Sequence, residues 1–273
     1  MDTIFIVLLL AIVQGITEYL PVSSSGHLVI LQHLFGITEP EILFDLVLHA
    51  GTLSALIVYY RKFILILITD AINSIMMILR SNESLTGLYK KNDNFRFIVL
   101  IIIGNIPTAF IGLFFKEEFQ SLFRSTDAVG VALLFTGTIL FATRFINSDN
   151  NHQNLTIPIA LLIGVAQGFA IVPGISRAGI TICIALFMKV NRELSARFSF
   201  MLSVPAIIGA LLIEFDTGTV SNNFTSIEYI VGFFVALLSG FAALLLLILL
   251  VKRDALFWFA FYCFAVAGIV LIT

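Results

Sequence analysis

Long apolar runs, repeated along the chain and separated by short polar breaks, constrain this sequence most. Runs of about 17 to 25 apolar residues, the length that crosses roughly 30 Å of hydrocarbon as a helix, occupy most of it. Of its 273 residues, 59% are hydrophobic and 12% charged, and an aqueous fold cannot bury such a share. We therefore expect an all-α integral membrane protein, with one transmembrane domain over residues 1–273.

The apolar runs form eleven segments, from which we expect about ten helical elements. They occupy residues 3–20, 27–36, 42–60, 63–79, 95–115, 127–146, 156–172, 177–188, 194–213, 227–251 and 255–272. Two of them, 27–36 and 177–188, are too short to span a bilayer, and each follows a proline and a cluster of small polar residues. Short helices after such breaks are typical of re-entrant elements, which enter and leave the membrane on one side.

The two breaks resemble each other. Ser24 follows Pro21 by three residues, and Ser176 follows Pro173 by the same interval, with a Gln-Gly pair before each proline. These features fall in corresponding places of the two parts of the chain. We therefore predict inverted-topology internal repeats, with halves of roughly 1–146 and 155–273. Paired interrupted helices of this kind indicate a binding site where they meet.

Charge excludes some partners and indicates an orientation. The formal net charge is only −2, so we expect no nucleic-acid partner; we also expect no organic cofactor. Cys183 and Cys263 lie in apolar segments without metal-ligand spacing and are assigned to packing. Basic residues gather between 61 and 96, partly in the polar connection 80–94, an expected extramembrane loop, whereas 147–154 has no Lys or Arg. The positive-inside tendency predicts that part of the basic stretch is cytoplasmic and the 147–154 loop external.

Gln14 and Glu18 are the first candidates for chemistry. They lie four residues apart in an apolar segment, so a helix projects both side chains from one face. An ionised carboxylate is costly in lipid, so Glu18 is expected to face a polar interior. The alternative is a carboxylate at the helix end, among the headgroups.

The break after Pro21 is a candidate phosphate site. Pro21 cannot continue the helical hydrogen-bond ladder. It is followed, after Val22, by Ser23, Ser24, Ser25, Gly26 and His27. A helix that begins here directs unpaired N–H groups and a partial positive charge at what lies before it, which suits phosphate. The alternative is that the serines only cap the helix.

Arg177 lies between Ser176 and Ala178, directly before an apolar run. Its side chain cannot easily reach the headgroups and therefore needs an anion. A guanidinium binds a carboxylate or a phosphate through two parallel hydrogen bonds. We expect phosphate recognition, and the alternative is a structural ion pair with Glu18. Asp45 and His49, again four residues apart, are either a helix-face pair lining the same cavity or a simple hydrogen-bonded pair.

Two motifs carry a family resemblance. The segments QGITEYLPVSSSGH (14–27) and PGISRAGIT (173–181) resemble the signature motifs of the undecaprenyl-diphosphate phosphatases of the bacitracin-resistance type. FDLVLHAGT (44–52), Ile106-Pro107 and FSFMLSVP (198–205) are also similar to family segments, in the same order. The resemblance extends along essentially the whole chain.

The resemblance implies a bacterial inner-membrane enzyme that hydrolyses undecaprenyl diphosphate to undecaprenyl phosphate and inorganic phosphate. Such an enzyme recycles the lipid carrier of peptidoglycan and cell-wall synthesis. Bacitracin sequesters the diphosphate, so extra phosphatase gives antibiotic resistance. The family fold has ten helical elements, two of them re-entrant, in interlocked inverted repeats, and it forms a homodimer. We further expect a multi-pass protein in contact with membrane lipids, with its active site on the outer side.

The resemblance also implies the site. By motif position, the catalytic residues are Glu18, Ser24, His27 and Arg177. Substrate binding is expected at Gln14, Ser23, Ser25, Gly26, Gly174, Ser176 and Thr181. The chain departs from the family at two positions: the family often has Glu where this chain has Gln14, although Gln also occurs, and usually has Ser where it has Ala178. The first departure weakens any two-carboxylate metal site, and the second removes one possible hydrogen bond to phosphate.

The expected chemistry is phosphoryl transfer to water, helped mainly by positioning and charge stabilisation. Arg177 and the two helix N-termini would hold the phosphates, Ser24 would attack the terminal phosphorus, and His27 would take its proton. Glu18 would orient His27 or bind a divalent cation, Mg²⁺ or Ca²⁺. In the alternative mechanism no phosphoserine forms, and His27 or Glu18 activates water directly.

Two other functions compete with a phosphatase. Inverted repeats with broken helices are also a transporter design, so a transporter or flippase of a phosphorylated lipid or small anion is the main alternative. A structural or receptor-like protein is the third, and it leaves Glu18 and Arg177 without a role.

Overall fold

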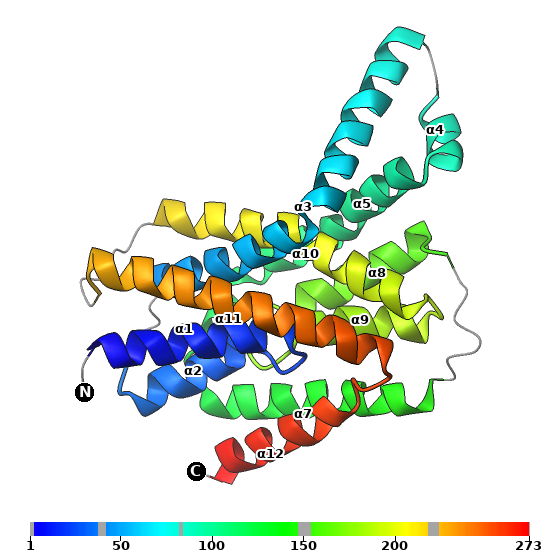
Figure 1. Cartoon of the computed structure of the whole chain (residues 1–273). Coiled ribbons are helices and arrows are strands. Elements are labelled where there is room, and N and C mark those ends of the chain that lie inside the picture. Colours follow the sequence, from blue (N-terminus) through cyan, green and yellow to red (C-terminus); the bar gives the residue numbers. More distant parts are fainter. Residues whose placement is uncertain (1–2, 38–41, 82–83, 147–153, 218–223, 273) are drawn as a thin grey trace.

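The computed structural model describes residues 3–37, 42–81, 84–146, 154–217 and 224–272. Over these ranges the secondary structure is helical and no β-strand forms (Figure 1). The helices are α1 (Thr3–Tyr19), α2 (Ser24–Leu34), α3 (Ile42–Ser81), α4 (Leu85–Lys91), α5 (Asp93–Phe114), α6 (Lys116–Leu122), α7 (Thr126–Ala142), the 3₁₀ helix η1 (Thr143–Phe145), α8 (Ile157–Phe169), α9 (Arg177–Phe187), α10 (Arg192–Thr217), α11 (Ser226–Lys252) and α12 (Trp258–Ile272).

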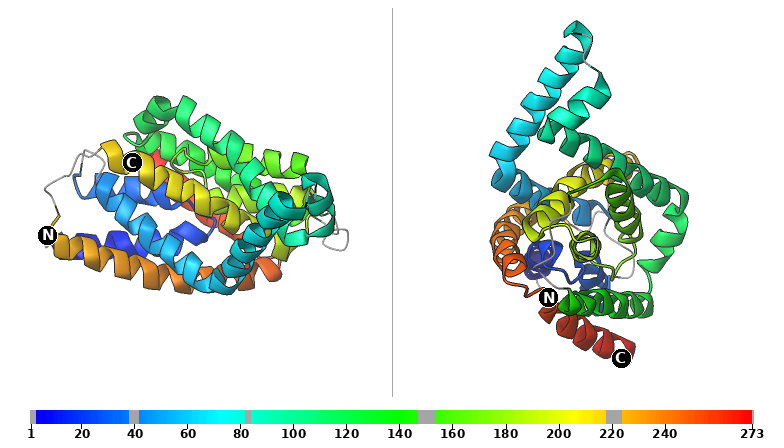
Figure 2. Two further views of the ribbon diagram at one scale, coloured as in Figure 1. Left: turned by 90° about the horizontal axis from the view of Figure 1, so that it is seen from above. Right: turned by 90° about the vertical axis from the view of Figure 1, so that its right-hand side faces the viewer.

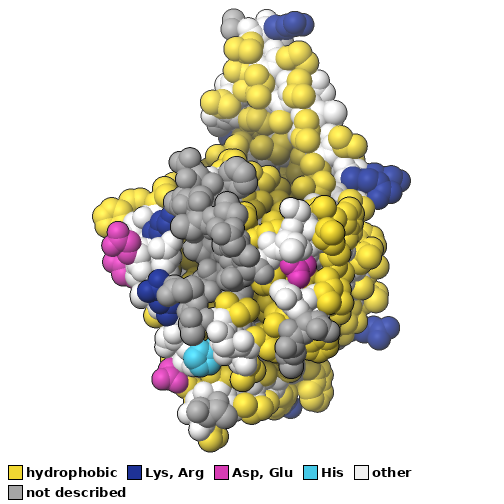
Figure 3. Space-filling view, turned by 90° about the vertical axis from the view of Figure 1, so that its left-hand side faces the viewer, with side chains coloured by type: hydrophobic (Ala, Val, Ile, Leu, Met, Phe, Trp, Pro, Cys, Tyr) yellow, Lys and Arg dark blue, Asp and Glu magenta, His cyan; other side chains and the backbone are white. Residues whose placement is uncertain are grey.

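Five of these helices are long and apolar enough to cross a membrane, by length and composition. They are α3, α5, α7 together with η1, α10 and α11. Many large hydrophobic side chains are exposed, and they are prominent on the face shown in Figure 3, as expected where lipid is the solvent. The prediction of an all-α, multi-pass membrane protein is confirmed.

Pairs of helices that are distant in sequence lie side by side in the bundle (Figures 1 and 2). α1 packs against α11, α5 against α8, and α7 against α12. A Cβ atom on Gly15 of α1 would lie 2.7 Å from the backbone nitrogen of Gly240 on α11, so only glycine permits this approach. Each of the three pairs joins a helix from one expected half to a helix from the other. The division at 1–146 and 155–273 itself stays a prediction.

Both predicted short helices are present after their breaks. α2 and α9 have 11 residues each, about 16 Å of helix, too short for a full crossing. α2 begins at Ser24, three residues before the predicted start, because the Ser23 side chain caps it by accepting a hydrogen bond from the Gly26 N–H. Capping at the break therefore determines where the short helix begins.

The segments predicted at 42–60 and 63–79 form one helix, α3, of 40 residues. Arg61 and Lys62 do not interrupt it, because both are good helix formers and no proline or glycine lies beside them. With α4, the second half of α3 projects from the bundle at the upper right of Figure 1. The polar connection 80–94, expected as a loop, contains α4, which Ser84 caps by accepting from the Gly87 N–H at 3.0 Å.

That part of the basic stretch is cytoplasmic and the 147–154 loop external stays a prediction, but the residues that flank the loop lie at the same end of the bundle as the start of α5. α5 begins at Asp93 and α7 is followed by η1, which ends at Phe145, and both helices are candidate spans. Two crossings return the chain to the side from which it started, on the right of Figure 1. Residues 147–153 lie outside the described residues.

Candidate active site

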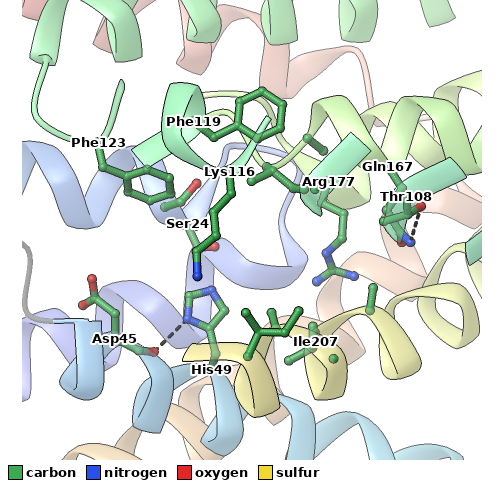
Figure 4. A pocket seen from close by; sticks show the side chains of 18 of the residues that line it. Ser24, Asp45, His49, Thr108, Lys116, Phe119, Phe123, Gln167, Arg177 and Ile207 are labelled. Atoms are coloured by element: carbon green, nitrogen blue, oxygen red, sulfur yellow. Dashed lines mark hydrogen bonds between the residues drawn. The ribbon is translucent and has the colours of Figure 1, made fainter. Parts of the chain in front are cut away.

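A cavity of about 1110 Å³ lies in the bundle beside the two breaks. Its polar wall is formed by residues from α1, α2, α3 and α9, and its apolar walls come largely from α5, α6 and α10 (Figure 4). The side chains that line its polar part include Glu18, Ser23, Ser24, Ser25, His49, Ser176 and Arg177. The helices thus bring residues of both motifs to the same cavity.

Glu18 is the centre of this polar wall. The Arg177 guanidinium forms an ion pair with Glu18 Oε1 through Nη2. Ser24 Oγ donates a hydrogen bond to Glu18 Oε2 at 2.6 Å, and Gln14 Nε2 donates to the same oxygen at 3.1 Å. His49 Nε2 lies 3.6 Å from Oε2. Glu18 therefore lies beside one side chain from each of α1, α2, α3 and α9. Ser24 of α2 is the candidate nucleophile among them.

Burial makes these interactions strong. The Glu18 side chain is only 5% exposed and that of Arg177 16%, so little solvent screens the pair. Arg177 Nη1 is buried and has no hydrogen-bond partner among the described residues, although the guanidinium points into the cavity in Figure 4. A buried donor without a partner is costly. Arg177 can therefore pair with Glu18 through one nitrogen and offer the other to an anion.

Ser23 connects the two breaks. Its backbone has φ 67°, a left-handed conformation that is uncommon outside glycine. Its Oγ accepts hydrogen bonds from the N–H of Gly26 at 3.3 Å and from the N–H of Gly174 at 3.0 Å. A Cβ atom on Gly26 would lie 2.9 Å from the Gly174 nitrogen, so the tips touch through their backbones. Ser23, Gly26 and Gly174 thus hold the two breaks together.

The other expected binding residues divide into two groups. Ser25 and Ser176 line the cavity, and Ser176 also caps α9 by accepting from the Gly179 N–H at 3.1 Å. Thr181 is 1% exposed, donates to the Arg177 carbonyl at 2.7 Å, lies 2.5 Å from the Ser199 hydroxyl and does not line the cavity. These contacts orient α9, and the Thr181 side chain does not reach the cavity where a substrate would bind.

The hydrogen bonds of His27 do not involve Ser24. Its Nδ1 lies 2.7 Å from the Ser23 carbonyl oxygen and its Nε2 2.8 Å from the Tyr262 hydroxyl. The ring stacks on Tyr262 and is 9% exposed, outside the lining of the cavity. The expected role of His27 as the base stays a prediction, and the geometry instead gives it a link between α2 and α12.

His49 lies beside Glu18 and lines the cavity, which was one of the two alternatives for the pair of Asp45 and His49. Figure 4 shows it pointing into the cavity, and Asp45 lines the same wall and accepts a hydrogen bond from Gln32 Nε2 at 2.8 Å. Lys116 of α6 also points into the cavity. Sequence reasoning missed Lys116 because it lies in a polar connection with no motif, and only the folding of α6 over the cavity reveals it.

A second polar group lies on the far wall. Gln167 Nε2 donates to Thr108 Oγ1 at 3.2 Å (Figure 4) and to Asn105 Oδ1 at 3.3 Å. Asn105 in turn donates to the carbonyl of Leu202 at 3.1 Å. These bonds tie α8 and α10 to α5, where Pro107 interrupts the backbone ladder. The group therefore fixes these three helices relative to one another where they line the cavity.

The described residues provide a poor resident site for a divalent cation. They contain no group of three His, Cys, Asp or Glu side chains placed to hold an ion. Both oxygens of Glu18 already receive donors, and the Arg177 charge lies against one of them, which disfavours a cation there. The expected metal role of Glu18 stays a prediction that this donor set does not favour.

Comparisons with known proteins match nearly the whole chain. A family model described as bacitracin resistance protein BacA matches residues 7–270. The undecaprenyl-diphosphatase of Desulfatibacillum aliphaticivorans is 41% identical, over 97% of this chain and 97% of that protein. The proteins of the same name from Carboxydothermus hydrogenoformans and Alkaliphilus metalliredigens are 41% and 40% identical, over 98% and 99% of this chain and 96% and 98% of their own lengths.

Proposed function

The chain belongs to the bacitracin resistance protein BacA family, and from this premise we propose how its site works. The protein is an undecaprenyl-diphosphate phosphatase: it hydrolyses undecaprenyl diphosphate to undecaprenyl phosphate and inorganic phosphate, which recycles the lipid carrier for cell-wall synthesis. The comparisons give the transporter alternative no support. The observation that carries the site assignment is the 2.6 Å hydrogen bond from Ser24 to Glu18, beside Arg177.

We propose that the diphosphate lies between Arg177 and the start of α2. The unpartnered Nη1 of Arg177 donates to a phosphate oxygen, and the backbone N–H groups at the first turn of α2 face the same anion. The prenyl chain follows the apolar wall, which includes Leu113, Phe119, Ile207 and Leu211. A hydrophobic wall beside an anion site matches a substrate with a charged head and a hydrocarbon tail.

In the proposed reaction Ser24 attacks the terminal phosphorus and Glu18 takes the hydroxyl proton. The 2.6 Å separation lies within the reach required of a general base. The lipid monophosphate leaves, and water then hydrolyses the phosphoserine. The support for a serine nucleophile over direct attack by water is that Ser24 already donates to the only carboxylate in the two motifs.

We propose that Mg²⁺ or Ca²⁺ takes part, if it does, as the cation bound to the diphosphate of the substrate. The support is the donor set around Glu18, which is occupied by Arg177, Ser24 and Gln14. A cation carried by the substrate needs no three-ligand protein site. We further propose the bacterial inner membrane as the location, membrane lipids as surroundings and a homodimer as the assembly, on the family resemblance.

We propose that the cavity opens to the outer side. The α6 connection, which forms part of the cavity wall, carries Lys116 and Arg124 beside Glu117 and Glu118. The other end of the bundle, on the right of Figure 1, holds the end of α3, α4, the start of α5, η1, the α9–α10 connection and the end of α11. These segments carry Arg80, Lys90, Lys91, Arg96, Arg144, Lys189, Arg192, Lys252 and Arg253. The positive-inside tendency makes that end cytoplasmic.

Phosphate release by the purified protein in detergent tests the function, because transport needs two compartments and hydrolysis does not. Wild-type protein is expected to release phosphate from undecaprenyl diphosphate. Ser24→Ala is expected to lower kcat by several orders of magnitude, whereas the cap of α2 is retained because Ser23 supplies it. Rapid quenching with radiolabelled terminal phosphate is expected to trap a phosphoprotein. Turnover by Ser24→Ala near the wild-type rate would contradict the serine mechanism.

A further inference from the structure

His49 has a defined orientation toward Glu18. Its Nδ1 lies 2.8 Å from the backbone carbonyl oxygen of Asp45, the contact drawn as a dashed line in Figure 4. A carbonyl oxygen can only accept, so Nδ1 carries the hydrogen of this bond. The second nitrogen, Nε2, therefore faces Glu18 Oε2 at 3.6 Å, and in the neutral ring it holds a lone pair that can accept a proton.

The same carboxylate oxygen receives Ser24 and Gln14. Ser24 Oγ donates to Glu18 Oε2 at 2.6 Å and Gln14 Nε2 at 3.1 Å. When Glu18 takes the Ser24 proton it loses its negative charge, and Arg177 loses its counter-ion in a nearly buried site. A second proton acceptor beside Oε2 restores the charge of Glu18. Gln14 cannot serve, because an amide does not accept a proton at ordinary pH.

The position of His49 also suits the exit of a proton. Its side chain is 29% exposed against 5% for Glu18, and it lines the cavity. The charged groups that share this part of the cavity are Glu18, Arg177, Asp45 and Lys116. His27 lacks this position, because both of its ring nitrogens face the Ser23 carbonyl and the Tyr262 hydroxyl.

We propose that His49 receives, through Glu18, the proton that Ser24 gives up. His49 thereby acts as the second proton acceptor beside Glu18, a role that a carboxylate at position 14 could also fill. In the first step the Ser24 Oγ–H bond breaks, the Oγ–P bond forms, and the proton passes by Glu18 to His49 Nε2. The bond from the terminal phosphorus to the bridging oxygen breaks, and its electron pair leaves with the lipid phosphate.

In the second step water attacks the phosphorus, and the P–Oγ bond breaks. The water proton passes by Glu18 to Ser24 Oγ, inorganic phosphate leaves, and His49 releases its proton to solvent at the cavity. The atoms balance with one water consumed and one proton released per turnover. Because His49 acts through Glu18, it is a positioning residue, and the inference rests on the proposed serine mechanism.

The first experiment compares His49→Gln and His49→Ala with wild type in the detergent assay on undecaprenyl diphosphate. His49→Gln retains a hydrogen-bonding group but cannot relay a proton, so kcat is expected to fall roughly 100-fold while KM stays within about two-fold. Added imidazole is expected to restore His49→Ala at least in part and to leave His49→Gln unchanged, because the glutamine fills the space. His33→Gln, an exposed histidine at the end of α2, is the control and retains wild-type kcat.

The second experiment adds Gln14→Glu to His49→Gln. Both side chains converge on Glu18 Oε2, so a carboxylate at position 14 is expected to raise kcat of the double variant at least roughly ten-fold above His49→Gln. A role for His49 in packing alone predicts no such recovery and no imidazole effect. His49→Gln with wild-type kcat overturns the inference. Activity lost in Ser24→Ala but kept in His49→Gln would leave the proposed function standing while the relay fails.

Discussion

At the scale of single residues, Arg177 shows that two expectations that were opposed in the sequence are compatible with one geometry. One alternative was phosphate recognition and the other an ion pair with Glu18. The structure gives the ion pair to Nη2 and leaves Nη1 buried without a partner among the described residues. A guanidinium can do both because its donors diverge in a rigid plane. A lysine ammonium has no such fork.

Arg177→Lys is therefore expected to lower kcat/KM by roughly 100-fold although the charge is retained, since one well-placed donor is worth about that much. The measurement is the detergent assay on protein that elutes as a single species. Arg197→Lys is the matched control, because Arg197 pairs with Glu193 on an exposed face of α10. Turnover by Arg177→Lys close to that of the control would tell against phosphate binding by Arg177.

Glu18 gives a prediction about metals. Glu18→Gln preserves shape but removes the base and the counter-ion of Arg177, so it is expected to be nearly inactive at every Mg²⁺ and Ca²⁺ concentration. If the cation belongs to the substrate, the concentration that half-activates the wild type follows the diphosphate concentration in the assay. A half-activating concentration that is independent of substrate, and that changes in Gln14→Glu, would point instead to a protein-held ion.

Several site residues could be predicted from the sequence because motif and chemistry agreed. Glu18, Ser24 and Arg177 lie together as expected. Polar and charged side chains in apolar helices are costly without a partner, so they are expected to pair with one another. The position of His27 could not be predicted, because its partner Tyr262 lies on α12 and only the packing of α12 brings the hydroxyl to Nε2. The choice between His27 and His49 beside Glu18 is likewise set by long-range packing.

At the scale of elements, the two breaks act as one unit. Their tips are joined by the Ser23 hydroxyl, which accepts from Gly26 on one break and from Gly174 on the other. Thr136 of α7 donates to the Gly174 carbonyl at 2.7 Å and accepts from the Ser176 N–H at 3.1 Å. The short helices that carry Ser24 and Arg177 are thereby fixed relative to each other.

Ser23→Ala is expected to leave two buried N–H groups without an acceptor, at a cost of about 1 to 3 kcal/mol for each that finds no substitute. Thermal unfolding in detergent should show a lower Tm, and kcat should fall because Ser24 and Arg177 lose their common support. Ser25→Ala is the control, since the Ser25 hydroxyl has only a 3.4 Å contact to Ser23. Equal Tm values for the two variants would show that the bridge contributes little.

Element boundaries could be predicted where a chemical signal marks them and not elsewhere. The proline breaks correctly located α2 and α9 because a missing N–H must end a ladder. The junction at Arg61-Lys62 was misread as a break, since charge alone does not interrupt a helix. The polar connection 80–94 conceals α4 for a similar reason: its Ser84 cap is a short-range signal within a polar stretch.

At the scale of the whole molecule, the arrangement of long helices determines where the site can open. α5 and α7 connect through α6, which forms one wall of the cavity, so we expect the cavity to open at the end of the bundle where α6 lies. Most of the basic residues lie at the other end. Whether two segments lie on the same side of the membrane depends on whether an even or an odd number of helices crosses between them. The number of crossings therefore links the distribution of basic residues to the orientation of the site.

The orientation can be measured by cysteine labelling in intact cells. Gln120 of α6 lines the cavity and is exposed, and Lys91 at the end of α4 is exposed at the opposite end. The native cysteines, Cys183 and Cys263, are both buried, so they leave the background low. A membrane-impermeant maleimide is expected to label Gln120→Cys in intact cells and Lys91→Cys only after permeabilisation, because the positive-inside tendency places the basic end in the cytoplasm.

Labelling of Lys91→Cys alone in intact cells would reverse the orientation and place diphosphate hydrolysis on the cytoplasmic side. Labelling of both positions only after permeabilisation would show that α6 is closed to the outside, and the outward opening would then be wrong.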